Sequence, residues 1–194
     1  RLTPVLNMVQ DTTTSLISVD TYKPEVAEFA PKNGAHIIND ISGGDSAELL
    51  NIVATYKAGI VLMHKHGNPT DMQDNPTYPN VVDTVYTYLS KQIQTARQAG
   101  ITDIVIDPGI GFGKTLAHNL ALLNQLSVFK DLGCPILLGT SNKRFIQDIT
   151  GAATQDRLPG SLASVIAGYQ HGAHIFRVHN IKETVQALDV YRAI

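Results

Sequence analysis

Residues 101–113 read ITDIVIDPGIGFG, and this stretch decides the fold class. Its apolar run, Ile104–Ile106, is short and continuous, stops at Asp107 and leads into a glycine-rich loop. Continuous runs of Ile and Val, without alternating polar residues, are typical of strands that are covered on both faces, as in a parallel sheet. The stretch therefore predicts a buried strand that ends in a carboxylate.

Five further runs of this kind occur along the chain, and each ends in polar residues. They are Leu16–Val19, His36–Ile38, Ile60–Met63, Ile136–Leu138 and Ile175–Val178. The six runs together predict six strands, each with polar side chains at its carboxyl end.

Amphipathic stretches separate these runs. Apolar residues at spacings of three and four predict helices over residues 81–99, 116–132 and 182–193. Pro24 is typical of a first helical turn, and Gly34 follows the end of the same helix. Strands and helices therefore alternate along the chain.

This alternation leaves two architectures, an open doubly wound sheet and a closed (β/α)8 barrel. Polar residues at the ends of all six strands favour the TIM barrel, in which every strand contributes to one site. Six units are two short of eight, so either two βα units precede Arg1 or the sheet is open. We find no low-complexity linker, and we predict a single domain over residues 1–194.

Composition narrows the classes of partner. Charged residues make up 16% of the 194 residues and the formal net charge is -2, so nothing indicates a nucleic-acid or anionic-membrane surface. No apolar run approaches the roughly 18 residues of a membrane span, and no signal-peptide pattern opens the chain. The single cysteine, Cys134, cannot form an internal disulfide, which favours the cytoplasm. We expect small-molecule substrates.

Carboxylate and amide groups end three of the predicted strands, at Asp20, Asn39 and Asp107. Together they suit a donor-rich heterocycle, since a carboxylate accepts two parallel N–H bonds from a guanidine-like edge, each worth roughly 1.5 to 3 kcal/mol. The alternative is that each Asp caps the helix or loop that follows it.

The segment DPGIGFGKT, residues 107–115, is neither of two known phosphate-binding motifs. A P-loop needs glycine where Pro108 stands, and a dinucleotide-binding motif needs its third glycine at Lys114. Glycines at alternate positions instead let the backbone approach a flat ligand closely.

Cationic residues follow the last two predicted strands. Lys143, in the run Ser141–Lys143, could hold a carbonyl or ring nitrogen, although an exposed lysine is usually only solvated. Arg177 and His179 lie two residues apart on a strand and point the same way, which indicates a site for phosphate or pyrophosphate. The alternative is an arginine packed against a helix carboxylate.

His64 and His66 share a face if the third strand continues past Met63, and that spacing could bind a metal. Residues 67–79 contain three prolines and predict an exposed loop. The turn at Gly67–Pro69 indicates that His66 already belongs to this loop and not to the strand.

Six short segments, in this order and near these spacings, resemble the dihydropteroate synthase family: ISVDTY, HIINDIS, VLMHKHGNPTDMQ, DPGIGFGKT, GTSNK and FRVHN. The resemblance covers the whole chain. It implies a (β/α)8 barrel of which this chain would carry the last six βα units. The family's enzyme is usually a homodimer, and it joins p-aminobenzoate to 6-hydroxymethyl-7,8-dihydropterin diphosphate with the help of Mg²⁺. The products are 7,8-dihydropteroate and pyrophosphate, and in the family's mechanism the C–O bond to the diphosphate breaks early.

The resemblance also implies roles for individual residues. The pterin would contact Asp20, Asn39, Met63, Asp107, Phe112 and Lys143, and the diphosphate would contact Arg177 and His179. The catalytic residues would be Asp107, Lys143, Arg177 and His179, while Arg144 would lie on the p-aminobenzoate side. The family's Mg²⁺-contacting Asn would lie upstream of Arg1, so no metal ligand is expected here.

Three positions depart from the family pattern. Asn142 and Arg144 stand where Arg and Ser are usual, and Asn180 replaces the usual Asp. The change at Arg144 would alter the p-aminobenzoate side of the pocket.

Three other functions stay open. The chain could be the pterin-binding domain of a folate-dependent methyltransferase, but Lys143, Arg177 and His179 argue against this because a methyl carrier needs no diphosphate site. It could be a metal-dependent hydrolase that uses His64 and His66, or a remnant that binds pterin without turnover.

Overall fold

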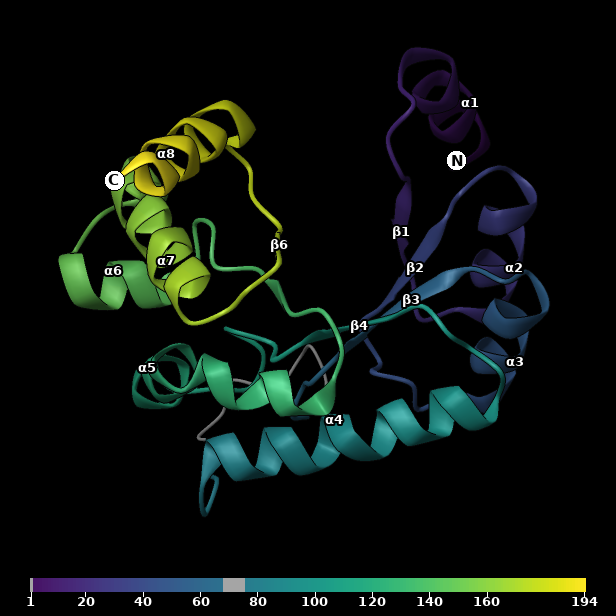
Figure 1. Ribbon diagram of the computed structural model, residues 1–194, viewed down its shortest axis with the longest axis horizontal. Helices are drawn as coiled ribbons and strands as arrows, with labels where there is room; N and C mark the ends of the chain where they lie inside the picture. Colours follow the sequence, from purple (N-terminus) through teal and green to yellow (C-terminus); the bar gives the residue numbers. More distant parts are fainter. Residues whose placement is uncertain (1, 68–75) are drawn as a thin grey trace. The chain divides into compact units, whose positions relative to one another are not determined.

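The computed structural model describes residues 2–67 and 76–194 (Figure 1). The chain forms two compact units, the first from residues 1–64 and 88–106 and the second from residues 65–87 and 107–194. The single domain expected over residues 1–194 stays a prediction.

The first unit is built on a four-stranded sheet in the order β1-β2-β3-β4. Its elements are α1 (Leu2–Thr12), β1 (Ser18–Asp20), α2 (Pro24–Lys32), β2 (Ile37–Asp40), α3 (Ala47–Thr55), β3 (Gly59–Met63) and β4 (Ile104–Asp107), of which only Asp107 belongs to the second unit. The long helix α4 (Val81–Gln98) has its first residues in the second unit and the rest in the first. The pairs β1–β2 and β2–β3 are parallel, with Val19 opposite Ile38 and Ile38 opposite Ile60.

Burial explains why the apolar runs become strands. Ile38, Ile60 and Leu62 are fully buried, as expected for strands covered on both faces. Helices α2 and α3 pack against each other and lie on the same side of the strands (Figure 1). Pro24 stands in the first turn of α2, and the Ser46 hydroxyl accepts the Leu49 N–H at the start of α3.

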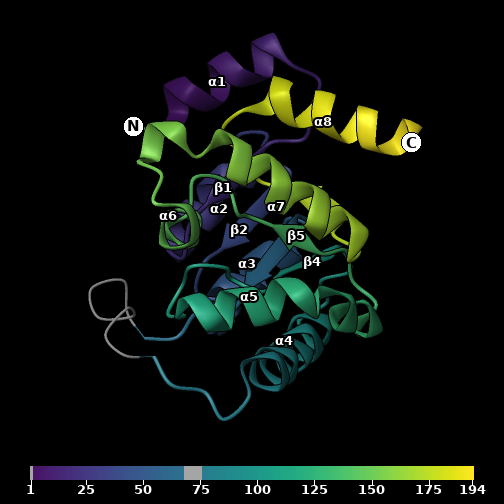
Figure 2. The same cartoon turned by 90° about the vertical axis from the view of Figure 1, so that its left-hand side faces the viewer.

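The second unit combines a two-stranded parallel sheet with helices. Its elements are α5 (Leu116–Asn124), the 3₁₀ helix η1 (Leu126–Leu132), β5 (Leu137–Leu138), α6 (Arg144–Thr150), the 3₁₀ helix η2 (Thr154–Asp156), α7 (Leu158–Gln170), β6 (Ile175–Phe176) and α8 (Ile181–Ala193). Leu138 lies opposite Phe176 in the sheet. Helices α7 and α8 pack against each other in both ribbon views (Figures 1 and 2).

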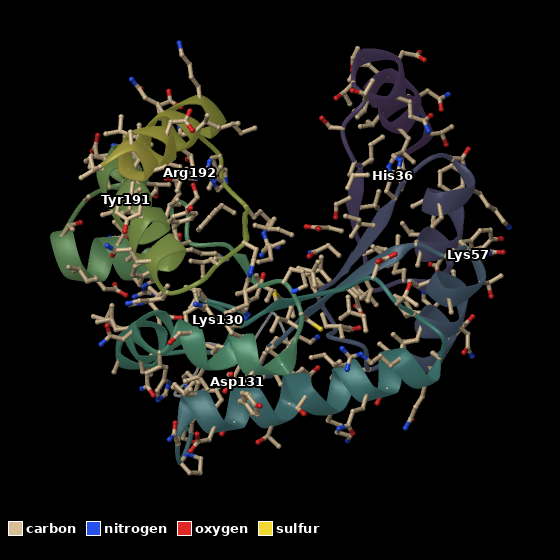
Figure 3. All side chains as sticks on the ribbon, in the orientation of Figure 1. His36, Lys57, Lys130, Asp131, Tyr191 and Arg192 are labelled. Carbon is tan, nitrogen blue, oxygen red and sulfur yellow. The ribbon has the colours of Figure 1, made fainter. Side chains whose placement is uncertain are left out.

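The tetrapeptide Gly-Ala-His-Ile occurs twice, once at the start of β2 and once at the start of β6. In the first copy the ring nitrogen Nδ1 of His36 accepts the Ile17 N–H at 3.1 Å, beside the beginning of β1 (Figure 3). In the second copy Nδ1 of His174 accepts the Ile136 N–H, also at 3.1 Å. A histidine ring thus extends the strand pairing by one hydrogen bond in each unit.

All six predicted strands are present, within one or two residues of their expected ends. The single helix predicted over residues 116–132 is wrong, because the chain leaves the α conformation at Gln125 and continues as η1. Leu126 and Phe129, three residues apart, are both buried, which matches the three-residue turn of a 3₁₀ helix. Most of the loop predicted over residues 67–79 lies outside the described residues. No helix in the described part of the chain is both long and apolar enough to cross a membrane.

Candidate functional site

Three predicted site residues end strands of the first unit. Asp20 is the last residue of β1 and is exposed, while Met63 is the last residue of β3 and is buried. Asn39 stands in β2 and is also buried. The sequence therefore assigned all three correctly to the carboxyl ends of strands.

Asp40, which follows Asn39, has a structural role. Its carboxylate is fully buried and accepts the Ser42 N–H at 2.8 Å, the Ser42 hydroxyl at 2.5 Å and the Gly44 N–H at 2.8 Å. These bonds close the turn after β2. The capping alternative thus describes Asp40.

The second unit pairs Asp107 with Arg177, which are 70 residues apart. The side chain of Asp107 is 1% exposed, and its Oδ2 accepts a bond from Nη2 of Arg177 at 2.7 Å. The other oxygen, Oδ1, accepts the Gly109 N–H at 2.8 Å, so this carboxylate both closes a turn and holds a cation. A Cβ at Gly139 would lie 2.9 Å from Nη2, so glycine there leaves the guanidinium its room.

Lys143 lies against the ring of Phe112. Its Nζ is 4.2 Å from the ring centroid, a cation–π contact. Burial lowers the pKa of Lys143, and the nearby Arg177 lowers it further, whereas Asp107 acts in the opposite direction. A Cβ at Gly111 would approach Cδ of Lys143 to 3.2 Å, so this glycine lets the lysine lie close to the backbone. Asp107, Phe112, Lys143 and Arg177, four of the six residues predicted from this unit, therefore form one cluster.

The glycine loop, residues 109–113, is bound by side chains from outside it. Four contacts hold its backbone: Asp107 accepts the Gly109 N–H at 2.8 Å, Asn119 accepts the Gly111 N–H at 2.8 Å, Lys114 donates to the Phe112 carbonyl at 3.0 Å and Tyr78 donates to the Gly113 carbonyl at 2.7 Å. The loop is therefore fixed in one conformation.

Lys114 was not among the predicted site residues. It is 3% exposed, and burial lowers its pKa to about 7, with Lys143 lowering it and Asp107 raising it. The signal in the sequence was its position directly after the alternating glycines and before Thr115, which caps α5.

His179 binds a residue that the sequence analysis did not single out. Its Nδ1 lies 2.9 Å from the hydroxyl oxygen of Ser141, and that oxygen also accepts the His179 N–H at 3.3 Å. The prediction that Arg177 and His179 both stand on the last strand is wrong, because β6 ends at Phe176 and both residues follow it. Their side chains bind two different residues, Asp107 and Ser141.

Comparisons with known proteins identify the family of this chain. The sequence profile of the pterin binding enzyme family matches residues 1–179. A dihydropteroate synthase from Escherichia coli strain K12 is 42% identical over 195 residues, which span all of this chain and 69% of the relative. The chain belongs to the dihydropteroate synthase family.

Solved structures of dihydropteroate synthases resemble the model closely. The enzyme from Thermus thermophilus in complex with 4-aminobenzoate is 39% identical, with a TM-score of 0.95 over 98% of this chain and 78% of that chain. The enzyme from Xanthomonas albilineans in complex with 7,8-dihydropteroate is 39% identical, with a TM-score of 0.91 over 98% of this chain and 72% of that chain. The predicted fold class, the (β/α)8 barrel of the family, is confirmed.

Two of the three departures from the dihydropteroate synthase pattern lie beside Lys143. Asn142 has a φ of 57°, a left-handed conformation that asparagine tolerates. Arg144 begins α6 with its side chain 85% exposed and Nε 3.5 Å from the carboxylate of Asp148. Arg144, Lys143 and Lys114 line a cavity of about 370 Å³. The third departure, Asn180, precedes α8.

The two histidines considered as metal ligands each contact an aromatic ring. His64 is buried with its ring edge-on to Tyr88 at 5.0 Å, and the ring of His66 lies 5.3 Å from that of Tyr78. Within residues 2–67 and 76–194, no three or more His, Cys, Asp or Glu side chains gather to hold a metal. We therefore derive no step through a metal, and the Mg²⁺ expected from the resemblance stays a prediction.

Proposed function

We propose that this chain catalyses the dihydropteroate synthase reaction. The substrates are p-aminobenzoate and 6-hydroxymethyl-7,8-dihydropterin diphosphate, and the products are 7,8-dihydropteroate and pyrophosphate. Family membership supports this, as do relatives that bind 4-aminobenzoate and 7,8-dihydropteroate. The observation that carries the proposal is the buried Asp107 carboxylate in one cluster with Lys143, Phe112 and Arg177.

The reaction breaks the C–O bond between the pterin methylene and the diphosphate and forms a C–N bond to the arylamine, which loses one proton. Negative charge develops on the departing diphosphate, so cations aimed at it lower the barrier. Arg177 and His179 are the groups that we assign to this task. A guanidinium has five N–H donors, so Arg177 can bind Asp107 and a diphosphate oxygen together.

The pterin cation left by early C–O cleavage needs a partner of opposite charge. The buried side chain of Asp107 forms an ion pair with Arg177 and lies near Lys143. We assign it the N–H edge of the pterin, with Lys143 binding a ring acceptor and Phe112 stacking on the ring. The pterin-binding roles of Asp20, Asn39 and Met63 in the first unit stay predictions from the resemblance.

Three further features belong to this proposal. Mg²⁺ would neutralise the diphosphate, the protein would act as a homodimer, and it would work in the cytoplasm. Turnover after exhaustive chelation by EDTA would argue against the metal. A monomeric mass by light scattering at micromolar concentration would argue against the dimer.

The deciding experiment is a mass-spectrometric assay for 7,8-dihydropteroate. The complete natural protein and residues 1–194 are each incubated with Mg²⁺, the pterin diphosphate and p-aminobenzoate. Asp107→Asn provides the matched inactive variant, because it keeps the shape of the side chain and removes its charge. We expect product from the complete protein and at least a hundredfold less from Asp107→Asn. A complete protein that binds pterin but forms no product would contradict the proposal and favour a methyl-transfer role.

A further inference from the structure

The ammonium group of Lys114 lies inside the second unit. The residue is 3% exposed, and its Nζ donates a hydrogen bond to the carbonyl oxygen of Phe112 at 3.0 Å. Burying an ammonium group is costly, so most lysines in this position of a loop would turn outward to water. A buried lysine therefore indicates that the bond to Phe112 serves the protein.

The Phe112 carbonyl belongs to the residue whose ring lies against Lys143. Fixing that carbonyl fixes the peptide plane after Phe112 and so restrains the backbone from which the ring projects. The peptides on either side are also bound, through the Gly111 N–H to Asn119 and the Gly113 carbonyl to Tyr78. The backbone of Phe112 itself is held at both ends, by its N–H bond to the Gly109 carbonyl at 3.1 Å and by the bond that its carbonyl accepts from Lys114.

We propose that Lys114 is a positioning residue for pterin binding, because its ammonium holds the Phe112 carbonyl so that the phenyl ring lies against Lys143. The proposal rests on the proposed function, in which Phe112 and Lys143 bind the pterin. Because Lys114 acts through Phe112, its substitution is predicted to weaken the binding of the pterin more than the binding of p-aminobenzoate.

Several charged or titratable groups surround Lys114. They are Asp107 at the end of β4, His118 in the first turn of α5, Tyr78 before α4, and Lys143, Arg144 and Asp148 around the cavity. Burial and Lys143 lower the pKa of Lys114 to about 7, against the opposing effect of Asp107. Above this pH the group loses its charge, and a neutral N–H donor forms a hydrogen bond about half as strong as a charged one. Pterin affinity is therefore predicted to fall as pH rises through 7.

Two variants test this role. Lys114→Met keeps the length of the side chain without the donor, and Lys114→Arg keeps a charge that does not titrate. Lys182→Met, on the exposed first turn of α8, is the matched control. All are made in the complete natural protein. KM for the pterin diphosphate, KM for p-aminobenzoate and kcat are measured from pH 6 to 9, together with the Kd of the pterin diphosphate by calorimetry and the melting temperature.

We expect Lys114→Met to raise KM and Kd for the pterin diphosphate about tenfold at pH 6, the loss of one charged hydrogen bond. Its KM for p-aminobenzoate should stay within about twofold, and its pterin affinity should no longer depend on pH near 7. Lys114→Arg should restore part of the affinity and also remove this pH dependence. Lys182→Met should match the wild type.

The proposal is overturned if Lys114→Met binds the pterin diphosphate as the wild type does, or if it raises only KM for p-aminobenzoate. A pH dependence near 7 that survives in both Lys114 variants would also overturn it. If the wild type binds the pterin diphosphate without turning it over, the proposed function falls and the Kd values still decide the role of Lys114. A wild type that binds no pterin overturns both proposals.

Discussion

The ion pair between Asp107 and Arg177 makes a quantitative prediction about stability. Arg177→Met keeps the aliphatic part of the side chain and leaves the buried carboxylate without its cation. Removing one partner of a fully buried pair costs about 3 to 5 kcal/mol, and a single charged hydrogen bond is worth about 1.5 to 3 kcal/mol. The Arg177 side chain is 37% exposed, so water screens part of the interaction and the lower range applies. Asp107 also keeps its bond from the Gly109 N–H.

We therefore expect Arg177→Met to lower the free energy of unfolding by about 2 to 3 kcal/mol. For a chain of this size that corresponds to a drop of about 4 to 12 °C in Tm. The assay is urea unfolding followed by two probes, far-ultraviolet circular dichroism and tyrosine fluorescence, because two compact units could unfold in separate steps. The double variant Asp107→Asn with Arg177→Met completes a thermodynamic cycle.

Arg192→Met is the control for this experiment. Arg192 lies near the end of α8 (Figure 3), is about half exposed and is 3.8 Å from Asp189. A surface pair of this kind is worth at most about 1 kcal/mol. The reasoning is refuted if Arg177→Met is no more destabilising than Arg192→Met. It is also refuted if the double variant loses as much free energy of unfolding as the two single variants together, because the coupling energy between Asp107 and Arg177 would then be zero.

Three further substitutions test other contacts, each by urea unfolding. A fall in the pKa of Lys114 from 10.5 to about 7 corresponds to about 5 kcal/mol, so Lys114→Met should be more stable than the wild type at pH 6. Between pH 7 and 10.5 the lysine is protonated only in the unfolded wild type, so the stability of the wild type rises with pH and the difference in the free energy of unfolding between variant and wild type should shrink. A difference that grows with pH would contradict this prediction. Gly113→Ala, whose Cβ would lie 2.4 Å from the His66 carbonyl oxygen, should lose about 2 kcal/mol more than Gly133→Ala, which has similar φ and no neighbour within 4 Å. Equal losses of stability in Gly113→Ala and Gly133→Ala would show that the loop moves to accommodate the added Cβ. Asp40→Asn should cost about 2 to 4 kcal/mol, because a buried acceptor of three bonds loses its charge, and a loss below 1 kcal/mol would argue against its structural role.

The sequence predicted the strands well because the physical cause is local. A run such as Ile104–Ile106 must be covered on both faces, and that requirement can be read from a few adjacent residues. The failure at Gln125 has a different cause. Residues 126–132 keep an apolar spacing of three, which fits both helix types, and the choice of a 3₁₀ turn depends on packing that the sequence does not display.

The candidate site was predictable in its residue types and less so in its pairings. Asp107, Lys143 and Arg177 stand at strand ends, where function gathers in this fold class. The bond between Asp107 and Arg177 joins residues 70 positions apart, and no spacing in the sequence encodes it. Ser141, the partner of His179, and Lys114 were missed for a different reason. A serine or a lysine becomes informative only when its burial is known, and the sequence does not show burial.

The glycine loop has a thermodynamic consequence for any ligand that contacts it. Ordering the backbone of one residue costs about 1 to 2 kcal/mol of conformational entropy, and more for glycine. In residues 109–113 the four side-chain contacts impose this cost during folding, before any substrate arrives. A ligand that meets this loop does not have to order its backbone, so this part of the entropy cost is absent from the binding step. If a substitution removed one of these four contacts, part of the loop would have to be ordered when the ligand binds. The affinity would then fall, although every atom that contacts the ligand is still present.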